Sequence, residues 1–248
     1  MKRLAKGQGA RGQTPRPLSP TERLIVALDF ASLEAALVMA RRLRGLVRTV
    51  KVGSVLFTAC GPEAIRSIRA LGFEVMLDVK FFDIPNTVAL SCRAAVTHHV
   101  SMVTLHAGGG TEMIRAAITG IHEEARRLSV PPPAVIGVTV LTSVESGGST
   151  GVARRVKELA QVAMDAGCDG LIASAHEVAG LRKQFGRRAR LMCPGIRPAS
   201  WSRDDQRRVC TPSDALRAGA DQLVVGRPIT AAADPRSAAL HLLAELAQ

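Results

Sequence analysis

Aromatic side chains are nearly missing from this sequence of 248 residues, which has six phenylalanines, one tryptophan and no tyrosine. Proteins that bind single-stranded nucleic acid stack the bases on aromatic side chains beside a basic groove. The formal net charge of +12 therefore does not indicate nucleic-acid binding, and we expect no such partner. An anionic substrate is an equally good reason for the excess of positive charge.

Paired cysteines, metal-ligand clusters and long apolar runs are also missing. The five cysteines are scattered and none belongs to a CxxC pair, which argues against a disulfide framework or a zinc site and favours a reduced cytoplasm. His106 has no nearby Cys or second His, and no His, Asp and Glu set has the spacing of metal ligands. We expect no metal, no pyridoxal or thiamine cofactor, and no membrane span, because polar residues interrupt every apolar run.

Acidic residues are absent from the first twenty positions. Five basic residues stand there: Lys2, Arg3, Lys6, Arg11 and Arg16. The segment has no apolar core, so it is not a secretory signal. We predict a disordered basic tail over residues 1–20 and one folded domain over residues 21–248.

Short β-branched runs alternate with amphipathic stretches through the rest of the chain. The predicted strands are Arg23–Asp29, Thr49–Val52, Glu74–Lys80, Met102–His106, Ala134–Leu141, Gly170–Ala173, Arg190–Pro194 and Gln222–Val225. The predicted helices are Leu33–Leu43, Pro62–Leu71, Thr87–Thr97, Thr111–Leu128, Val152–Ala166, Val178–Phe185, Pro212–Ala218 and Pro235–Ala247. This strict alternation predicts a single α/β domain, a (β/α)8 TIM barrel. An open doubly wound sheet is the alternative, but it requires a glycine-rich turn that the segment 29–32 does not provide.

Polar residues lie at the carboxyl ends of the predicted strands, where barrels gather their reactive groups. They are Asp29, Asp78 with Lys80, His106, Thr142 with Ser143, Arg197, and Gly226 with Arg227. A purely structural barrel would have no reason to place so many polar strand ends on one face. Lys51 lies within an apolar strand, and its alternative interpretation is a side chain that snorkels to the rim.

Lys80 is one of only six lysines beside 27 arginines, and it ends an apolar strand. Because side chains alternate along a strand, Asp78 and Lys80 point the same way, about 7 Å apart along the backbone. Asp83 follows in the next turn, close enough to complete a carboxylate–ammonium–carboxylate array. Paired charges at such a position indicate a working site, although a structural ion pair capping the strand is the alternative.

Two turns after the last predicted strands are candidates for binding phosphate. Gly226 allows the backbone to approach an anion, and Arg227 can bind two phosphate oxygens. Arg197 lies in a second such turn, and the polar segment 199–208 after it has the composition of a mobile lid. An ordinary turn is the alternative for each. The glycines at 108–110 could also bind phosphate, but a flexible helix entry is the favoured interpretation.

Residues 78–87, with the sequence DVKFFDIPNT, resemble the DxKxxDIPNT signature of the orotidine 5′-phosphate decarboxylase family. The resemblance continues, in order, from about residue 23 to residue 247. It includes Ala27-Leu28-Asp29, Val50-Lys51-Val52-Gly53, Leu141-Thr142-Ser143, Pro194-Gly195-Ile196-Arg197-Pro198, Asp204-Asp205-Gln206 and Val225-Gly226-Arg227-Pro228-Ile229.

The resemblance implies a cofactor-free lyase that converts orotidine 5′-monophosphate to uridine 5′-monophosphate, the last step of pyrimidine nucleotide synthesis. Lys80 would donate a proton to C6 of the pyrimidine. Asp78, and Asp83 of the neighbouring subunit in a homodimer, would hold the Lys80 ammonium in place. The resemblance also implies that Asp29, Lys51 and Thr87 contact the ribose, and that Thr87 does so in the partner's site. Thr142 would bind near the pyrimidine. The phosphate would be bound by Arg197, Gln206, Gly226 and Arg227.

Related sugar-phosphate decarboxylases and synthases share an Asp-x-Lys-x-x-Asp motif but use a magnesium ion. The resemblance suggests that they carry a carboxylate ligand where this chain has Lys51, and that they lack the IPNT continuation. A cation at position 51 would repel a metal ion, so we expect metal-free chemistry. In that chemistry a preorganised electrostatic field stabilises a carbanion at C6.

Overall fold

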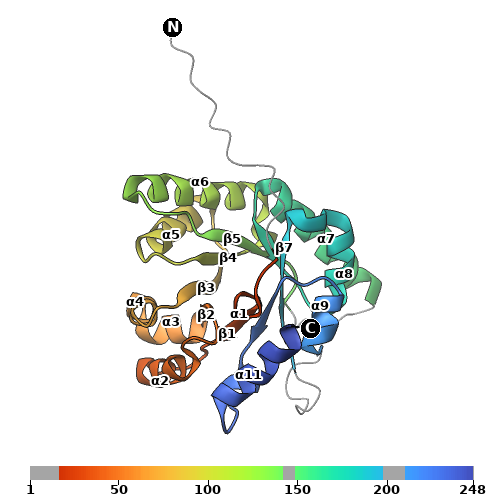
Figure 1. Ribbon diagram of the computed structural model, residues 1–248. Helices are drawn as coiled ribbons and strands as arrows, with labels where there is room; N and C mark the ends of the chain where they lie inside the picture. The colour runs from red at the N-terminus through yellow and green to blue at the C-terminus, as the bar shows by residue number, and fades with distance from the viewer. Residues whose placement is uncertain (1–16, 142–148, 198–209, 248) are drawn as a thin grey trace.

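The computed structural model describes residues 17–141, 149–197 and 210–247. Within them, eight parallel strands close into a barrel in sequence order, with helices around the outside (Figure 1). The strands are β1 (Leu24–Ala27), β2 (Thr49–Gly53), β3 (Glu74–Phe81), β4 (Met102–His106), β5 (Ala134–Val138), β6 (Gly170–Ile172), β7 (Arg190–Pro194) and β8 (Gln222–Val225). The pairing of Leu24 with Leu223 joins β1 to β8. The predicted TIM barrel is confirmed, and the open sheet is wrong.

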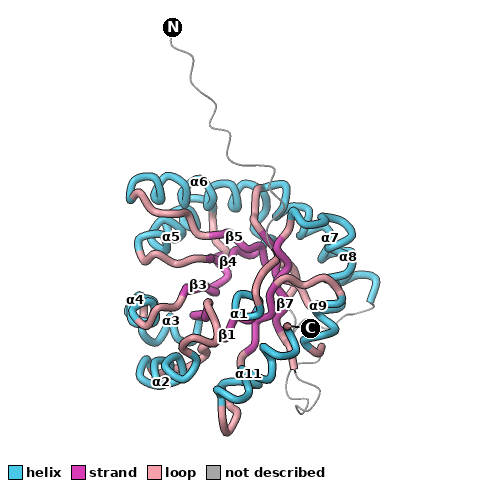
Figure 2. Tube along the Cα trace, viewed as in Figure 1, coloured by secondary structure: helices cyan, strands magenta, loops and turns pink. Residues whose placement is uncertain are grey.

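The helices form the outer layer around the strands (Figure 2). Those that were expected are α2 (Leu33–Leu43), α4 (Pro62–Ala70), α5 (Pro85–Thr97), α6 (Gly110–Leu128), α7 (Ser149–Ala166), α8 (Ala175–Phe185), α9 (Pro212–Arg217) and α11 (Pro235–Leu246). Short elements that the sequence did not reveal are α1 (Pro20–Arg23), α3 (Ser54–Cys60), η1 (Ala107–Gly109), η2 (Gly186–Arg188) and α10 (Arg227–Thr230). No helix of the described part is long and apolar enough to cross a membrane.

Alternation along the strands divides the apolar core into two parts. Inward-facing residues fill the barrel: Ile25, Ala27, Met76, Met102, Ile136, Val138, Ile172, Met192 and Val224. Their neighbours, such as Leu24 and Val26, pack outward under the helices. Because both faces are buried, the strands appear in the sequence as nearly continuous apolar runs. The same alternation decides which side chains at the carboxyl ends of the strands point into the barrel.

Strand β5 is shorter than the predicted segment Ala134–Leu141. It ends at Val138, opposite Ile172, because β6 ends there and offers no further partner. The next residue, Thr139, turns both its backbone N–H and its hydroxyl to the carbonyl oxygen of Ile172, at 3.3 and 3.0 Å. This bond ends the ladder and sends the chain out over the barrel rim.

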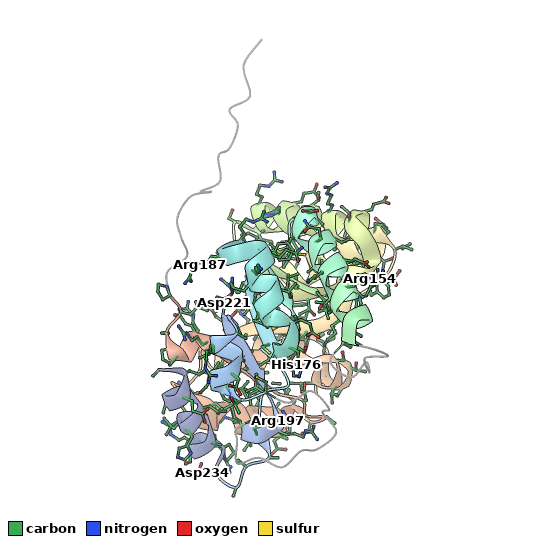
Figure 3. All side chains as sticks on the ribbon, turned by 90° about the vertical axis from the view of Figure 1, so that its right-hand side faces the viewer. Arg154, His176, Arg187, Arg197, Asp221 and Asp234 are labelled. Carbon is green, nitrogen blue, oxygen red and sulfur yellow. The ribbon has the colours of Figure 1, made fainter. Side chains whose placement is uncertain are left out.

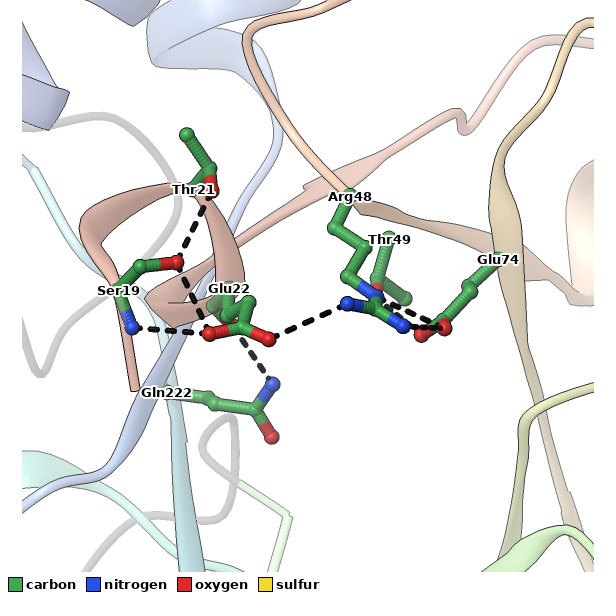
Figure 4. A network of polar contacts seen from close by, with 7 residues as sticks. All are labelled: Ser19, Thr21, Glu22, Arg48, Thr49, Glu74 and Gln222. Carbon is green, nitrogen blue, oxygen red and sulfur yellow. Dashed lines mark hydrogen bonds and ion pairs between the residues drawn. The ribbon is translucent and has the colours of Figure 1, made fainter. Parts of the chain in front are cut away.

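A polar network joins the first described residues to the amino ends of the strands (Figure 4). Glu22 of α1 accepts from the Ser19 backbone N–H at 3.0 Å and pairs with Arg48 at 3.3 Å. Arg48 also pairs with Glu74 of β3 at 2.8 Å, and Gln222 of β8 donates to the Glu22 carbonyl oxygen at 2.8 Å. Helix α1 begins within the predicted tail, whose residues 1–16 lie outside the described ranges.

Candidate active site

A cavity of about 370 Å³ lies at the carboxyl ends of the barrel strands. Seven of the predicted site residues line it: Asp29, Lys51, Asp78, Lys80, Arg197, Gly226 and Arg227. Its apolar lining includes Met76, Val138, Ile172 and Val224, which belong to the barrel interior. An anionic ligand that enters this cavity therefore meets cationic groups above an apolar floor.

Four charged side chains form a continuous array along one wall of the cavity. Lys51 Nζ lies 2.9 Å from Asp29 Oδ1 and 3.4 Å from Asp78 Oδ2. The other oxygen of Asp78, Oδ1, lies 2.9 Å from Lys80 Nζ. Lys51 and Asp78 are buried, with 9% and 6% of their surfaces exposed. The predicted proximity of Asp78 and Lys80 is confirmed, whereas the snorkelling interpretation of Lys51 is wrong.

The period of the strands explains why these groups meet. On β1, the inward-facing Ile25 and Ala27 are followed by Asp29; on β3, Met76 is followed by Asp78. Gly53 is required beside them because the Cβ of any larger residue would lie 2.7 Å from Lys51 Nζ and 2.9 Å from Asp29 Oδ1. The missing side chain leaves room for the Lys51–Asp29 pair.

The carboxyl group of Asp78 remains ionised in spite of its burial. Desolvation by itself raises its pKa, but attraction to Lys51 and Lys80 opposes this effect. Hydrogen bonds from Lys80 and Thr104 add to that attraction, and together they hold the pKa below its usual range. A buried carboxylate between two ammonium groups gives the cavity a fixed and strongly polarised wall.

Lys80 reaches Asp78 from an unusual backbone conformation. Its φ of 50° lies in the left-handed region, which costs roughly 1–3 kcal/mol for a residue other than glycine. The pairing of β3 with β4 shifts register between Leu77 and Phe81, so Lys80 lies within an irregular part of the ladder. Its backbone N–H donates to Thr104 Oγ1 at 2.9 Å. Strain of this kind is concentrated at functional sites, where the surrounding structure must maintain it.

The predicted phosphate-binding residues lie at the neighbouring ends of β7 and β8. Gly226 and Arg227 follow β8, and Arg227 is exposed at the start of α10. Arg197 is buried, and its Nη1 donates to the Ile196 carbonyl oxygen at 3.0 Å. Figure 3 shows Arg197, after β7, well separated from Arg187, which precedes that strand. The predicted residues Thr142 and Gln206 lie outside the described ranges.

Asp83 and Thr87 do not line this cavity. They line a second hollow of about 360 Å³ between β3, α3 and α5, which adjoins the cavity at Lys80. Asp83 is exposed, and its Oδ1 accepts from the backbone N–H of Ile84 at 2.7 Å. No described cation forms an ion pair with Asp83, so within a single chain the array contains Asp78 but not Asp83.

Comparisons with known proteins agree with this geometry. The model of the "Orotidine 5'-phosphate decarboxylase / HUMPS family" matches residues 22–242. Two proteins named orotidine 5′-phosphate decarboxylase, from Nitratidesulfovibrio vulgaris (strain DP4) and Moorella thermoacetica, are 46% and 45% identical to the chain over 229 and 232 residues. These alignments cover 90% and 91% of this chain, and 97% and 92% of the relatives. The chain belongs to this family.

A solved structure supports the family assignment. The orotidine 5′-phosphate decarboxylase from Lactobacillus acidophilus superposes with a TM-score of 0.78 and 33% identity, covering 92% of this chain and 100% of that one. The family resemblance read from the DVKFFDIPNT segment is confirmed. The family name includes a second group, HUMPS, beside the decarboxylases. The charged array bears on which of the two groups this chain resembles in its chemistry.

Sequence reasoning missed one polar residue of the decarboxylase-family site, Thr104. It is fully buried on β4, and its hydroxyl donates to Asp78 Oδ1 at 3.1 Å. The signal was present, because Thr104 stands two residues after the inward-facing Met102 in an otherwise apolar strand. Which face of β4 points inward, however, is decided by the barrel register.

The glycines at 108–110 serve the entry to α6. Gly108 N–H donates to His106 Nδ1 at 3.0 Å, and a Cβ on Gly109 would lie 2.1 Å from Met113 Sδ. These close contacts account for the glycines without an anion, and the helix-entry interpretation is favoured. His106 also lies beside Phe82, with ring centroids 5.2 Å apart.

Proposed function

We propose that this protein decarboxylates orotidine 5′-monophosphate to uridine 5′-monophosphate without a metal or cofactor. The observation that carries the proposal is the Lys80 ammonium, 2.9 Å from the buried carboxylate of Asp78 and on the wall of a cavity with an apolar floor. An ammonium so placed supplies both a positive field and a proton. This arrangement suits a reaction whose main energetic barrier is the formation of a carbanion with its charge localised on one carbon.

The phosphate group binds at the ends of β7 and β8. Arg227 and Arg197 supply positive charge there, and Gly226 allows close approach of the backbone. Gln206 completes the phosphate contacts in this proposal. Charge-assisted hydrogen bonds to phosphate are about twice as strong as neutral ones, so this end anchors the nucleotide.

The ribose and the pyrimidine occupy the space between the phosphate and Lys80. Asp29 and Lys51, paired at 2.9 Å, bind the ribose hydroxyls, and Thr142 binds near the pyrimidine. Binding energy from these parts of the substrate is available to align the ring at the reacting carbon. The reaction is thereby assisted by groups that take no part in bond breaking.

In the chemical step, the bond between C6 and the carboxylate carbon breaks and CO2 departs. The electron pair remains on C6, where the Lys80 ammonium stabilises it and then transfers a proton to it. Lys80 regains a proton from solvent. Asp78 holds the ammonium in place beforehand, so little reorganisation is required as charge develops.

The magnesium-dependent sugar-phosphate branch is disfavoured by the position of Lys51. Its ammonium lies between the carboxylates of Asp29 and Asp78, at 2.9 and 3.4 Å, where two oxygen ligands for a cation would otherwise meet. A divalent metal at this point would have to displace Lys51 against charge repulsion. The array therefore supports the decarboxylase branch.

The proposal includes a homodimer in which Asp83 and Thr87 complete the site of the partner. Both residues line the hollow beside α5, and neither lines the cavity of its own chain. Four apolar side chains with more than half of their surface exposed lie on α3, on α5 and in the loop before α5: Val55, Phe82, Ile84 and Leu90. An apolar patch of this kind favours a protein interface. A second copy that covers it would carry Asp83 toward the other chain's array.

The test is a spectrophotometric assay of the purified protein with orotidine 5′-monophosphate, in the presence and absence of EDTA. We expect the nucleotide absorbance to fall equally in both, with uridine 5′-monophosphate and CO2 formed in equal amounts. Turnover that requires Mg²⁺, or that occurs only with a sugar phosphate, would contradict the proposal. A protein that only binds nucleic acid would leave the absorbance unchanged.

A further inference from the structure

Thr104 connects the two residues on which the proposed reaction depends. Its Oγ1 accepts from the backbone N–H of Lys80 at 2.9 Å and donates to Asp78 Oδ1 at 3.1 Å. A hydroxyl is one of few groups that can accept and donate through a single atom. Because Thr104 is fully buried, water cannot take over either bond without entering the core.

The first bond replaces a missing part of the sheet. The register of β3 against β4 shifts between Leu77 and Phe81, and Lys80 in that interval has a φ of 50°. Its N–H therefore uses the Thr104 hydroxyl in place of a ladder carbonyl. Without that acceptor, a partly buried donor would lose its partner. The irregular backbone at Lys80 would then lose a bond that maintains it.

The second bond fixes the carboxylate to which the Lys80 ammonium is bound. Oδ1 of Asp78 accepts hydrogen bonds from Thr104 Oγ1 and from Lys80 Nζ, while Oδ2 lies 3.4 Å from Lys51 Nζ. The hydroxyl thus restricts rotation of the carboxylate plane. It also couples that plane to the backbone from which the Lys80 side chain extends.

We infer that Thr104 is a positioning residue, whose hydroxyl links the left-handed backbone of Lys80 to the Asp78 carboxylate and so sets the direction of the ammonium. The inference rests on the proposed function, since it assigns Thr104 an effect on the decarboxylation step. Thr104 is not among the residues that line the cavity, so we assign it no contact with the substrate. Its effect should appear in kcat more than in nucleotide affinity.

Two substitutions separate the hydroxyl from the shape of the side chain. Thr104→Val keeps the shape and removes the hydroxyl, and we expect kcat to fall at least about tenfold while product affinity changes less than about threefold. Thr104→Ser keeps the hydroxyl and should restore most of the lost kcat. A matched control is Thr139→Val, because Thr139 is equally buried but donates to the Ile172 carbonyl oxygen, away from the array.

Amide hydrogen exchange gives a readout that does not depend on turnover. The Lys80 amide should be protected in the native protein and in Thr104→Ser, and should exchange faster in Thr104→Val but not in Thr139→Val. An unprotected Lys80 amide in the native protein would overturn the inference, and this measurement stands even if Thr104→Val does not fold. Equal losses of kcat in Thr104→Val and Thr139→Val, or an unchanged kcat in Thr104→Val, would also overturn it.

If the native protein does not decarboxylate the nucleotide, the proposed function fails, whereas the exchange data still decide whether Thr104 holds Lys80.

Discussion

The ammonium of Lys80 lies 2.9 Å from Oδ1 of Asp78, and Lys80 reaches it from a left-handed backbone. A regular strand would already place these two side chains on one face. The strained conformation and the shift of register add a defined direction to the lysine side chain. Such strain persists only where the surrounding structure maintains it, which agrees with a role in the site rather than in capping the strand.

Replacement of Lys80 by alanine should abolish turnover while nucleotide binding largely survives. Of the two lysines that line the described part of the cavity, Lys80 has the more exposed side chain, 35% against 11% for Lys51, and it is the proposed proton donor. The measurement is kcat by absorbance, with product affinity by calorimetry, and Lys183→Ala on the exposed face of α8 is the control. More than a few per cent of the native kcat in Lys80→Ala would remove the assignment.

Replacement of Arg227 by alanine should weaken the binding of uridine 5′-monophosphate far more than that of uridine. A charge-assisted hydrogen bond contributes roughly 1.5–3 kcal/mol to the binding free energy. Uridine has no phosphate and does not make this bond, so its affinity should not change. Calorimetry with both ligands measures the difference. Arg187→Ala removes an equal charge in η2, which precedes β7 and lies well away from Arg197 (Figure 3), and it should alter neither affinity. Equal losses for both ligands in Arg227→Ala would show that this residue does not bind phosphate.

Replacement of Gly53 by alanine should displace Lys51 without unfolding the barrel. The new Cβ would lie 2.7 Å from Lys51 Nζ, the movable end of a long side chain, so the ammonium shifts and the Asp29 pair opens. We expect KM to rise by about tenfold or more, from the loss of a charge-assisted contact to the ribose. Gly180→Ala is the control, because Gly180 is exposed on α8 and the nearest atom outside the backbone of that helix, Lys157 Cε, would lie 3.9 Å from the new Cβ. An unchanged KM in Gly53→Ala would contradict the role given to the pair.

Truncation tests the predicted tail. Deletion of residues 1–16 should leave kcat/KM within about twofold, because a terminal segment whose sequence has no apolar core contributes little to a folded domain. Deletion through residue 22 also removes the Glu22 contacts to Arg48 and Ser19 and should lower the melting temperature. A collapse of activity in the shorter deletion would show that the tail packs against the site or the subunit interface.

Subunit mixing tests whether Asp83 acts in the partner's site. Lys80→Ala and Asp83→Ala are each expected to be inactive, and they are mixed in equal amounts under conditions that permit exchange. In a mixed dimer one site carries both substitutions, and the other combines intact Lys80 with intact Asp83. Random exchange makes about half of the dimers mixed, so roughly a quarter of native activity should return. Mass spectrometry verifies exchange; if exchange occurs and activity does not return, Asp83 acts within its own chain.

The sequence by itself determined the strand and helix pattern, and with it the barrel. Apolar runs and amphipathic periods are local properties, so most element boundaries agree within a few residues. The proximity of Asp78 and Lys80 was also local, because the two residues are separated by one strand period. The short helix α3 escaped prediction, since Ser54–Cys60 contains no charged residue to mark a polar face.

Only the tertiary structure decided how separate strands share one site. Lys51 lies between Asp29 and Asp78 because β1, β2 and β3 pair in a particular register, which no single segment specifies. The pairing of β4 with β3 brings Thr104 beside Asp78, and the pairing of β5 with β6 ends at Val138. Asp83 lies in the loop after β3, outside the cavity of its own chain. Sequence periodicity fixes which side chains share a face. Contacts between strands depend on long-range pairing and on irregularities such as the one at Lys80, which only the closed barrel defines.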